Sequence, residues 1–581
     1  MKNLSAEQSF WDGPQPTPME LGIDTPLTYL NASWKIAVDL VDRGRRLYRE
    51  GKALQDGQPD RPGGFPGAWL PVSLGRRAPL VYPWDERDIR HAAKMMTYLW
   101  AGEEGLFEEY ERNLFVEQIR KNGDFQAHGG DVSPLVGVVG MFMASAADLG
   151  WCYGITPGKQ GKILSNIVKL LKRTRVVFDP EGSGFLNVGV DKVWHSRGFW
   201  GTFLGENFHF PSNFDGRNKL TIAGMAMAVF AKRYRDAARD IGAPEAKALA
   251  ACHDELVEAI ETRAWSESAD YYYLQRDDNS DRWFLSMNGL CEASRETDIV
   301  PYYAAEVCNI PERVKAVGRV LEHALLKERV FPMPTRYPTY SWYSPHHPNG
   351  VDMGDDCGQI GGAWDTPYFH CVELLERLGL QKALQRAVLR RAEVIHRDGD
   401  CLESYYQDGT VDDTRFYNRD QYIVSGTAHL AAIVEGLFGI TPAKTGFAEV
   451  NLRPNLPLYR RYRHTTHPSD WSGRDNRISV LLGSRGRFDM TICYDEDAET
   501  LTLRTTAMGI PAHIRLPLDL GARFRSAAWN GKPVKARIEK GMDSDFIHMD
   551  HCLDGGTLTV RLAPHPQKGK GGTTYVTPEE T

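Results

Sequence analysis

The chain has 581 residues with a net charge of −7, a hydrophobic fraction of 42% and a charged fraction of 25%. These values are typical of a soluble globular protein, and they argue against a nucleic-acid partner, which requires a basic surface. The length exceeds what one ordinary core supports, so we expect one large domain and one smaller domain. Because no run of eighteen apolar residues occurs in the sequence, we also expect no membrane partner.

The first 440 residues have the periodicity of helices. Segments that are apolar on all sides alternate with segments that carry a single apolar stripe, which are typical of buried and surface helices respectively. About twelve helical segments are predicted, at 27–51, 86–101, 105–121, 133–150, 158–174, 216–241, 245–265, 300–309, 311–327, 364–379, 381–397 and 420–438.

The clearest pair of helices lies at 216–241 and 245–265. The first segment is apolar on nearly all sides over its first half and is followed by Gly242, a frequent residue just beyond a helix end. Pro244 then opens a segment with one apolar stripe. Buried and amphipathic helices in alternation predict a mainly α fold, an (α/α)6 barrel. An α-solenoid is the alternative, but no repeat of fixed period is evident.

After residue 440 the pattern changes to short segments of alternating or β-branched character, separated by Gly, Asp and Pro. This pattern predicts a C-terminal antiparallel β-sandwich. The predicted boundaries are 1–26 for an N-terminal extension, 27–441 for the barrel, 442–565 for the sandwich and 566–581 for a flexible tail.

Two long connections, 184–217 and 331–362, are rich in Trp, Tyr, His and Asp. Loops of this length are uncommon unless they build a site, so we expect them to wall a pocket at one end of the barrel. Aromatic residues make up 10% of the chain, with 14 Trp and 24 Tyr. Aromatic faces suit the C–H bonds of sugar rings, although a large aromatic core would give the same composition.

Two loop acids are candidates for a catalytic pair. Asp215, with Arg217 close behind it, precedes one buried helix, and Glu403 precedes a later one. Two carboxylates facing each other across one pocket, one protonated and one ionised, are what glycoside hydrolysis requires. Asp356 and Gln359 are further candidates in the second long loop, with Asp356 as a reserve acid.

Five short segments resemble motifs of the trehalases of glycoside hydrolase family 37 and the α-glucosidases of family 63. They occur in the order that those families show, and that order is their most specific feature. They are SPLVG and YPWDERD near the start, SNFDGR around Asp215, WDTP at 364–367, and LESYY around Glu403.

The resemblance implies an inverting, exo-acting glycoside hydrolase that releases a terminal α-linked sugar, with no metal or organic cofactor. By motif match, Asp215 would be the general acid and Glu403 the general base. In an inverting enzyme such a pair stands roughly 6.5–9.5 Å apart, leaving room for water. The sugar-binding residues implied or suggested beside them are Trp84, Asp85, Arg217, Asp356, Gln359, Trp364, Asp365 and Tyr405.

Several alternatives remain open. SNFDGR and the WDTP segment lack flanking Gly-Trp residues of trehalases, which argues against trehalose, and the sandwich is more similar to that of α-L-rhamnosidases. A polysaccharide lyase on the same barrel, using a Tyr or His base, is a second enzyme class. A carbohydrate-binding protein without activity is a third reading. Trp84 and Trp364 can equally be core residues, and Asp85 can be a helix N-cap.

From the sequence we expect no metal site and a cytoplasmic location. Adjacent His346 and His347 diverge in most backbones, and the acids of 277–281 lack the calcium-loop pattern, so we expect a solvated turn there. The nine cysteines form no CxxC pair, and the N-terminus has no apolar leader segment, so we expect a cytoplasmic protein with free thiols. A secreted chain trimmed of its leader would have the same sequence.

Overall fold

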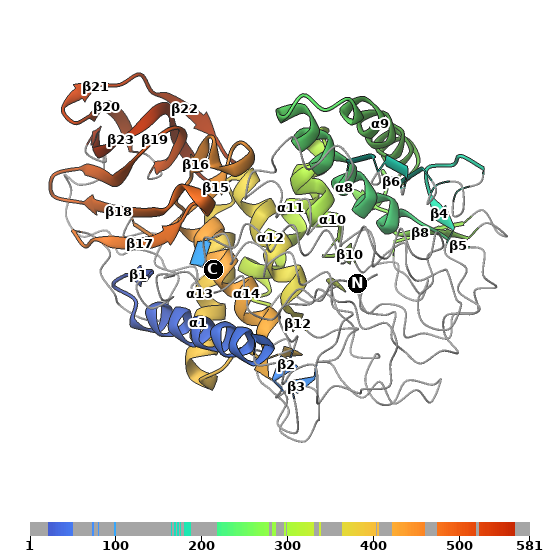
Figure 1. The fold of residues 1–581 in the computed structure, drawn as a ribbon, viewed down its shortest axis with the longest axis horizontal. Coiled ribbons are helices and arrows are strands. Elements are labelled where there is room, and N and C mark those ends of the chain that lie inside the picture. Colours follow the sequence, from blue (N-terminus) through green and yellow to red (C-terminus); the bar gives the residue numbers. More distant parts are fainter. Residues whose placement is uncertain are drawn as a thin grey trace, which may run out of the picture.

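The fold was analysed in a computed structural model of the chain (Figure 1). At some described positions only the backbone is specified. The structure describes residues 21–49, 73–74, 79–80, 98–99, several helical positions between 164 and 175, 179, 181–187, 218–277, 282–285, 295–297, 299–330, 336–337, 363–402, 404–405, 421–458, 473–518 and 522–563.

Three helical hairpins in succession, followed by one more helix, make up most of the described helical part. The hairpins confirm the paired helices predicted for this stretch of the sequence. Their helices are α8 (Thr221–Asp240) with α9 (Glu245–Arg263), α10 (Ile299–Glu306) with α11 (Pro311–Glu322), α12 (Asp365–Leu378) with α13 (Gln381–Asp398), and α14 (Ile423–Ala431). α11 and α14 continue into π-helical turns, η5 (His323–Lys327) and η7 (Ala432–Leu437).

In the hairpin of α8 and α9, burial follows the predicted alternation. Residues 224–231 of α8 are buried on every side of the helix, whereas α9 buries one stripe, which includes Leu249, Leu256 and Ile260. Cys252 is half-buried, whereas the neighbouring His253 is buried with the stripe. Gly242 has the left-handed backbone (φ 68°) expected just beyond the end of α8.

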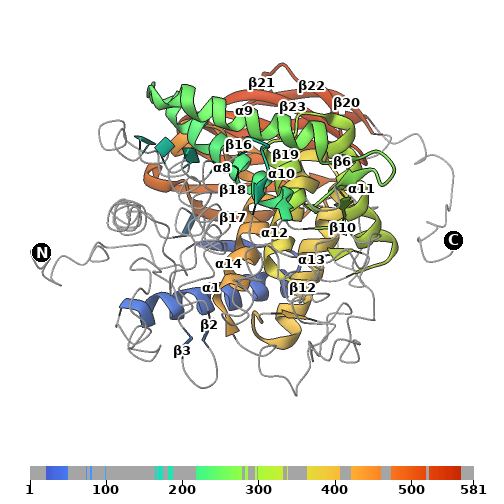
Figure 2. The same cartoon turned by 90° about the vertical axis from the view of Figure 1, so that its right-hand side faces the viewer.

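The buried helices pack side by side in chain order, α8 on α10, α10 on α12 and α12 on α14. An N-terminal helix, α1 (Thr28–Arg49), lies against α13 and α14 (Figure 2). Tyr98, from the helix predicted at 86–101, donates a hydrogen bond to Oε1 of Glu435 (2.9 Å) in η7. The helices predicted at 86–101 and 158–174 are described at a few positions only, and those predicted at 105–121 and 133–150 lie outside the described residues, so the closed ring of six hairpins stays a prediction.

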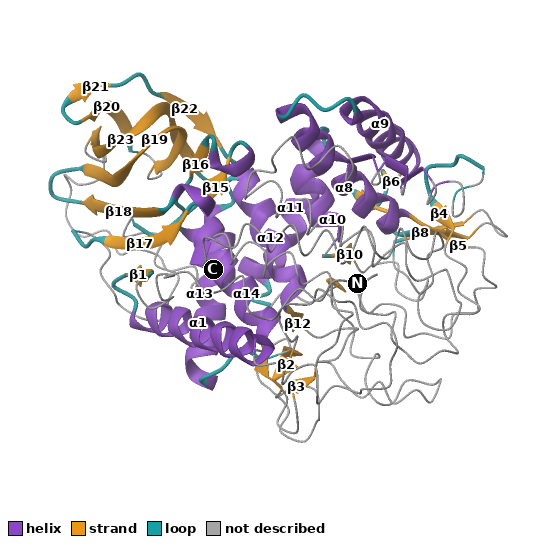
Figure 3. Ribbon diagram, viewed as in Figure 1, coloured by secondary structure: helices purple, strands orange, loops and turns teal. Residues whose placement is uncertain are grey.

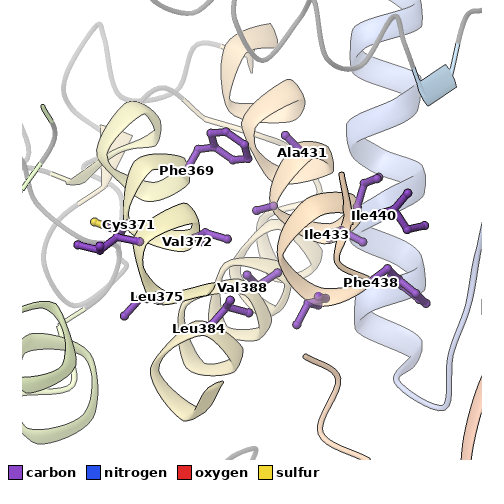
Figure 4. Packing of buried hydrophobic residues seen from close by; sticks show 14 of the residues in the cluster. Phe369, Cys371, Val372, Leu375, Leu384, Val388, Ala431, Ile433, Phe438 and Ile440 are labelled. Atoms are coloured by element: carbon purple, nitrogen blue, oxygen red, sulfur yellow. The ribbon is translucent and has the colours of Figure 1, made fainter. Parts of the chain in front are cut away.

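The core between these helices is apolar. Figure 4 shows Phe369 and Val372 of α12 on the side of that helix that faces α14 and η7, with Phe369 toward Ala431. These residues are buried, as are Leu384, Val388, Ile433, Phe438 and Ile440. Burial of this apolar area is the main favourable term that holds the helices together.

The C-terminal part is one hydrogen-bonded sheet of ten strands (Figure 3), antiparallel except where β16 pairs with β19. The antiparallel strands predicted after residue 440 are therefore confirmed, and the β-sandwich predicted from them stays a prediction. The strands are β1 (Gly22–Asp24), β15 (Ile440–Pro442), β16 (Val450–Leu452), β17 (Asn476–Leu481), β18 (Arg487–Asp495), β19 (Thr500–Leu518), β20 (Arg523–Trp529), β21 (Lys532–Pro533), β22 (Arg537–Lys540) and β23 (Asp545–Ala563).

Two features of the sheet differ from the sequence expectation. The segment 500–518, expected as two strands separated at Gly509 and Pro511, is one long strand, β19. Its register against β23 shifts between Ala507 and Pro511, and this irregularity accommodates a residue that has no backbone N–H. Residues 22–24, expected in an N-terminal extension, form β1 and pair with β17 at the edge of the sheet.

Helices and sheet meet at the turn between α12 and α13. The carboxylate of Asp543, on the segment before β23, accepts hydrogen bonds from the backbone N–H groups of Gln381 and Lys382, both at 3.0 Å. The N–H of Met542 donates to Leu378 O (2.9 Å). The sheet thus supplies the N-terminal cap of α13, which has no side-chain cap from its own neighbouring residues.

The end of α12 is fixed to the sheet by charge. Arg515 of β19, which is buried, donates to both the carboxylate and the backbone carbonyl of Glu376. Arg453 contacts the other carboxylate oxygen at 3.4 Å. A Cβ on Gly379 would lie 2.5 Å from Phe546, so the turn that follows α12 is closed tightly against β23.

Removing the cap at Asp543 is predicted to weaken the seam between helices and sheet. We expect Asp543→Ala to lower the free energy of unfolding by about 1 kcal/mol, the usual cost of losing a helix N-cap. The measurement is a urea titration followed by circular dichroism. Asp545→Ala is the matched control, because Asp545 makes an ion pair with the exposed Lys540. Pairs of that kind contribute little. Equal effects of the two substitutions would contradict the capping role.

Candidate functional site

The helical hairpins give the bundle two different ends. Short turns, 241–244, 307–310 and 379–380, join each buried helix to its outer partner at one end. Long connections, 264–298, 328–364 and 399–422, join each outer helix to the next buried helix at the other end. The N-termini of the buried helices and all of the long connections between the described hairpins therefore lie at the same end, where we place the candidate active site.

A short strand precedes each buried helix at this end, visible in Figure 1 below α8 and α12. Each of these strands pairs with a segment from another connection, so the loops are tied to one another. The strands are β5 (Asn218–Leu220) before α8, β10 (Arg295–Glu296) before α10, β12 (Ala363–Trp364) before α12 and β14 (Gln421–Tyr422) before α14.

Two of the segments singled out from the sequence lie side by side. β12, which contains Trp364, pairs antiparallel with β13 (Ser404–Tyr405), which directly follows position 403. In the register, Trp364 is opposite Ser404 and Ala363 is opposite Tyr405. The WDTP and LESYY segments are thus neighbours in space.

The LESYY segment is also anchored to α14. The Oγ of Ser425, a fully buried residue in the first turn of that helix, donates a 2.6 Å hydrogen bond to Leu402 O. Leu402 immediately precedes position 403, and Ser404 immediately follows it in β13. The backbone is therefore fixed on one side of the predicted base by α14 and on the other side by β12, the strand that precedes α12.

The other predicted segments lead into the same group of small sheets. β3 (Pro79–Leu80) ends shortly before Trp84 and forms a hairpin with β2 (Ser73–Leu74), which pairs with β14. β5 begins just after Arg217 and pairs with β4 (Leu186–Asn187) and β8 (Gln275–Asp277).

The predicted site residues are described to different extents. Trp364 and Tyr405 lie in β12 and β13, and Asp365 is the first residue of α12, with the backbone alone described for all three. The spacing of the two acids and the roles of all ten residues stay predictions. The residues that lie outside the described part of the chain are Trp84, Asp85, Asp215, Arg217, Asp356, Gln359 and Glu403.

One carboxylate at this end was not singled out from the sequence. Glu296 is buried and accepts hydrogen bonds from the N–H groups of Ile299 (2.9 Å) and Val300 (2.8 Å) at the start of α10. A negative charge there is stabilised by the unpaired N–H groups of the helix terminus. Only its position three residues before an apolar helical segment could have indicated this role.

A buried polar group lies among α1, α12, α13 and α14. His429 of α14 is fully buried, with Nε2 3.0 Å from the Oγ of Ser33, which itself donates to Leu30 O. The Ser33 hydroxyl therefore accepts the Nε2–H of a neutral imidazole. Arg391, also fully buried, lies over the ring of Tyr368, 5.9 Å from its centroid. Burial, and secondarily the Arg391 charge, hold the pKa of His429 well below its ordinary value.

Metal and membrane binding were also considered. Within the described residues, no group of three or more His, Cys, Asp or Glu side chains is arranged to hold a metal ion. β8 and β9 (Arg282–Phe284) form a hairpin around 278–281, the segment expected to be a turn. Among the helices that the structure describes, none combines the length and apolarity needed to cross a bilayer.

No family model and no curated protein matches this sequence. Solved structures do match its fold. A family 78 rhamnosidase of Bacillus sp. GL1 aligns over 86% of this chain and 43% of its own, with a TM-score of 0.54 and 16% identity. The α-L-rhamnosidase of Streptomyces avermitilis, in complex with L-rhamnose, aligns over 94% and 42%, with a TM-score of 0.50 and 11% identity. The chain thus spans less than half the length of either protein.

The family 63 mannosylglycerate hydrolase of Thermus thermophilus aligns over 69% of this chain and 99% of its own, with a TM-score of 0.45 and 11% identity. That similarity is too low to support an argument, so the resemblance to families 63 and 37 stays a prediction. The two rhamnosidase structures show that the chain has a fold of the kind found in those glycoside hydrolases.

Loss of the Ser425 hydroxyl is predicted to disturb the LESYY segment more than the fold. If Glu403 acts in catalysis, Ser425→Ala should lower kcat about tenfold, a change of about 1.4 kcal/mol in activation free energy. The variant should be assayed on the glycoside that the wild type hydrolyses. Ser33→Ala is the control, because Ser33 is equally buried but bonds within α1 and to His429. An equal loss of kcat in both variants would indicate a general effect of stability.

The buried neutral His429 predicts a pH dependence of stability. Its pKa is lowered in the native state, so between that pKa and about 6.5 the unfolded state binds a proton that the native state does not. Stability should therefore be complete above about pH 6.5 and decrease as the pH falls. Thermal melts at stepped pH should show a shallower decrease for His429→Gln than for the wild type. His396→Gln, at an exposed position, should leave the slope unchanged.

Proposed function

We propose that this protein is a glycoside hydrolase. Two kinds of support converge on this class. The fold matches those of two rhamnosidases. Two of the sequence segments that resemble glycosidase motifs, WDTP and LESYY, are neighbours at the end of the bundle where the buried helices begin. Because the fold alone does not fix an activity, the proposal rests on the residues at this end.

The observation that carries the proposal is the ladder between β12 and β13. The WDTP and LESYY segments were identified independently in the sequence, on either side of α12 and α13. Two segments that line one pocket must lie close together, and these two pair at the N-termini of α12 and α14. If either segment resembled a glycosidase motif only by chance, there would be no reason for the two to be neighbours. The hydrogen bond from Ser425 to Leu402 supports a fixed backbone around Glu403.

In the proposed reaction a terminal α-linked sugar of an oligosaccharide or small glycoside is released with inversion. Asp215 would give its proton to the leaving oxygen, while Glu403 would take a proton from the water that attacks the opposite face of the sugar. Trp84, Asp85, Trp364 and Asp365 would bind the sugar. No cofactor takes part in this chemistry, because both proton transfers are made by side chains.

The second candidate for the substrate is an α-L-rhamnoside. It is favoured by the two structures with the higher TM-scores, both of rhamnosidases, and one of them holds L-rhamnose. Both candidates belong to the same reaction class and would use the same two acids, so they differ in the shape of the sugar pocket and not in the proton transfers.

The test is a panel of α- and β-linked glucosides, mannosides and L-rhamnosides, with the anomer of the product read by NMR at early times. We expect hydrolysis of an α-linked member with inversion. Asp215→Asn and Glu403→Gln should each lower kcat by about 10²–10⁴-fold, the usual contribution of a general acid or base. Asp497→Asn is the control, because Asp497 lies in an exposed turn of the sheet.

Three outcomes would contradict the proposal in different ways. Near-wild-type activity of both acid variants would refute the assigned pair, and a product with retained configuration would refute inversion. An unsaturated product that absorbs in the ultraviolet would identify a lyase. Sugar binding without turnover in the wild type, unchanged by Asp215→Asn, would identify a binding protein.

A further inference from the structure

A pocket of about 350 Å³ lies at the opposite end of the buried helices, where they meet the sheet. The C-terminal halves of α8, α10 and α12 line it together with η7, and β15 and β16 close it on the sheet side. Pockets of roughly 300–1,000 Å³ hold small-molecule ligands, and such pockets often lie between structural units. Along α12, at about 1.5 Å per residue, the lining residues lie from about 8 Å (Phe369) to about 20 Å (Arg377) beyond Trp364 of β12.

The described lining is unusually rich in paired charges. Arg233 of α8 donates to Glu306 at the end of α10 (2.5 Å). Arg453 contacts Glu376 of α12 at 3.4 Å, and Asn451 of β16 donates to the hydroxyl of Thr441 (3.1 Å). Because these side chains hold one another in place, their polar atoms are oriented before any ligand arrives, which lowers the cost of binding.

Arg377 contributes differently to the wall. Its guanidinium donates to the carbonyls of Ala304 (2.6 Å), Ala305 (2.8 Å) and Cys308 (3.0 Å), and it thereby caps the C-terminus of α10. A fixed cation beside the negative end of the helix dipole is stabilising. The positive charge of Arg377 also offsets part of the negative charge that the glutamates and the helix C-termini place around the pocket.

The lining therefore offers hydrogen-bond donors and acceptors in similar number, with formal charges that nearly cancel. Three arginines and four glutamates of the described residues line the pocket. Phosphates or polyamines would meet repulsive charges as well as attractive ones. Hydroxyl groups suit such a wall, since each can donate to a carboxylate and accept from a guanidinium. Phe369, Val372 and Pro442 add apolar surface for C–H groups.

We propose that this pocket binds a neutral polyhydroxyl molecule of about the size of a monosaccharide, at a site separate from the candidate active site. The proposal is independent of the catalytic assignment, because it uses none of the residues at the other end of the helices. A ligand here would contact helices and sheet together, so its binding would stabilise the native state and raise Tm by an amount that grows with the logarithm of its concentration above Kd.

The experiment is isothermal titration calorimetry with D-glucose, L-rhamnose and D-mannose as neutral probes, and D-glucuronate and D-glucosamine as charged ones. Glu403→Gln is used as the background, so that turnover does not interfere. Ala305→Phe fills the pocket from α10, and Thr441→Phe fills it from β15. Ala251→Phe, at an exposed position on α9, is the matched control.

We expect a neutral sugar to bind, and each pocket-filling variant to weaken that binding at least tenfold while Ala251→Phe leaves it unchanged. Thermal melts verify that both variants fold. The proposal is overturned if filling the pocket leaves the affinity unchanged, or if a charged probe binds more tightly than every neutral one. On the wild-type background Ala305→Phe should keep kcat/KM within twofold on a hydrolysed glycoside, which separates this result from success or failure of the proposed hydrolysis.

Discussion

Parallel packing of the buried helices is the constraint on which the rest of the structure depends. Each buried helix is joined to the next through an outer helix that runs in the opposite direction, so α8, α10, α12 and α14 all point the same way. Their N-termini and the long connections then share one end of the bundle, and their C-termini share the other. The positions of both the candidate active site and the second pocket follow from this single arrangement.

The two ends use the same helices in different ways. At the N-terminal end, short strands tie the long connections to one another, and Ser425 and Glu296 fix the backbone where helices begin. At the C-terminal end the helices stop against the sheet, where Asp543 caps α13 and Arg515 binds the end of α12. Reactive segments can therefore be held by local pairing, while the global stability of the bundle comes from its apolar core and the sheet.

Buried polar residues lie between these regions. Removing them from water costs free energy, and their hydrogen-bonded or charged partners offset that cost. The Arg391 guanidinium shares the interior with a neutral His429, because a second buried cation would be unfavourable. Glu261 likewise accepts hydrogen bonds from Tyr272 (2.9 Å) and Tyr303 (2.7 Å) and pairs with Arg313 (2.7 Å) where α9, α10 and α11 meet. Desolvation is the largest cause that keeps the pKa of both tyrosines far above the usual range, followed by the charge of Glu261 for Tyr303 and by Cys308 and then Glu261 for Tyr272.

Local pattern in the sequence was sufficient to predict the hairpins α8–α9, α10–α11 and α12–α13, the helices α1 and α14, and the antiparallel strands after residue 440, because hydrophobic period and Gly or Pro punctuation act over a few residues. It also identified WDTP and LESYY as candidate segments. It could not predict that they pair as β12 and β13, that Asp543 caps a helix some 160 residues earlier in the chain, or that β19 continues through Pro511. These contacts join residues far apart in the chain, and only packing of the whole fold determines which of many possible partners meet.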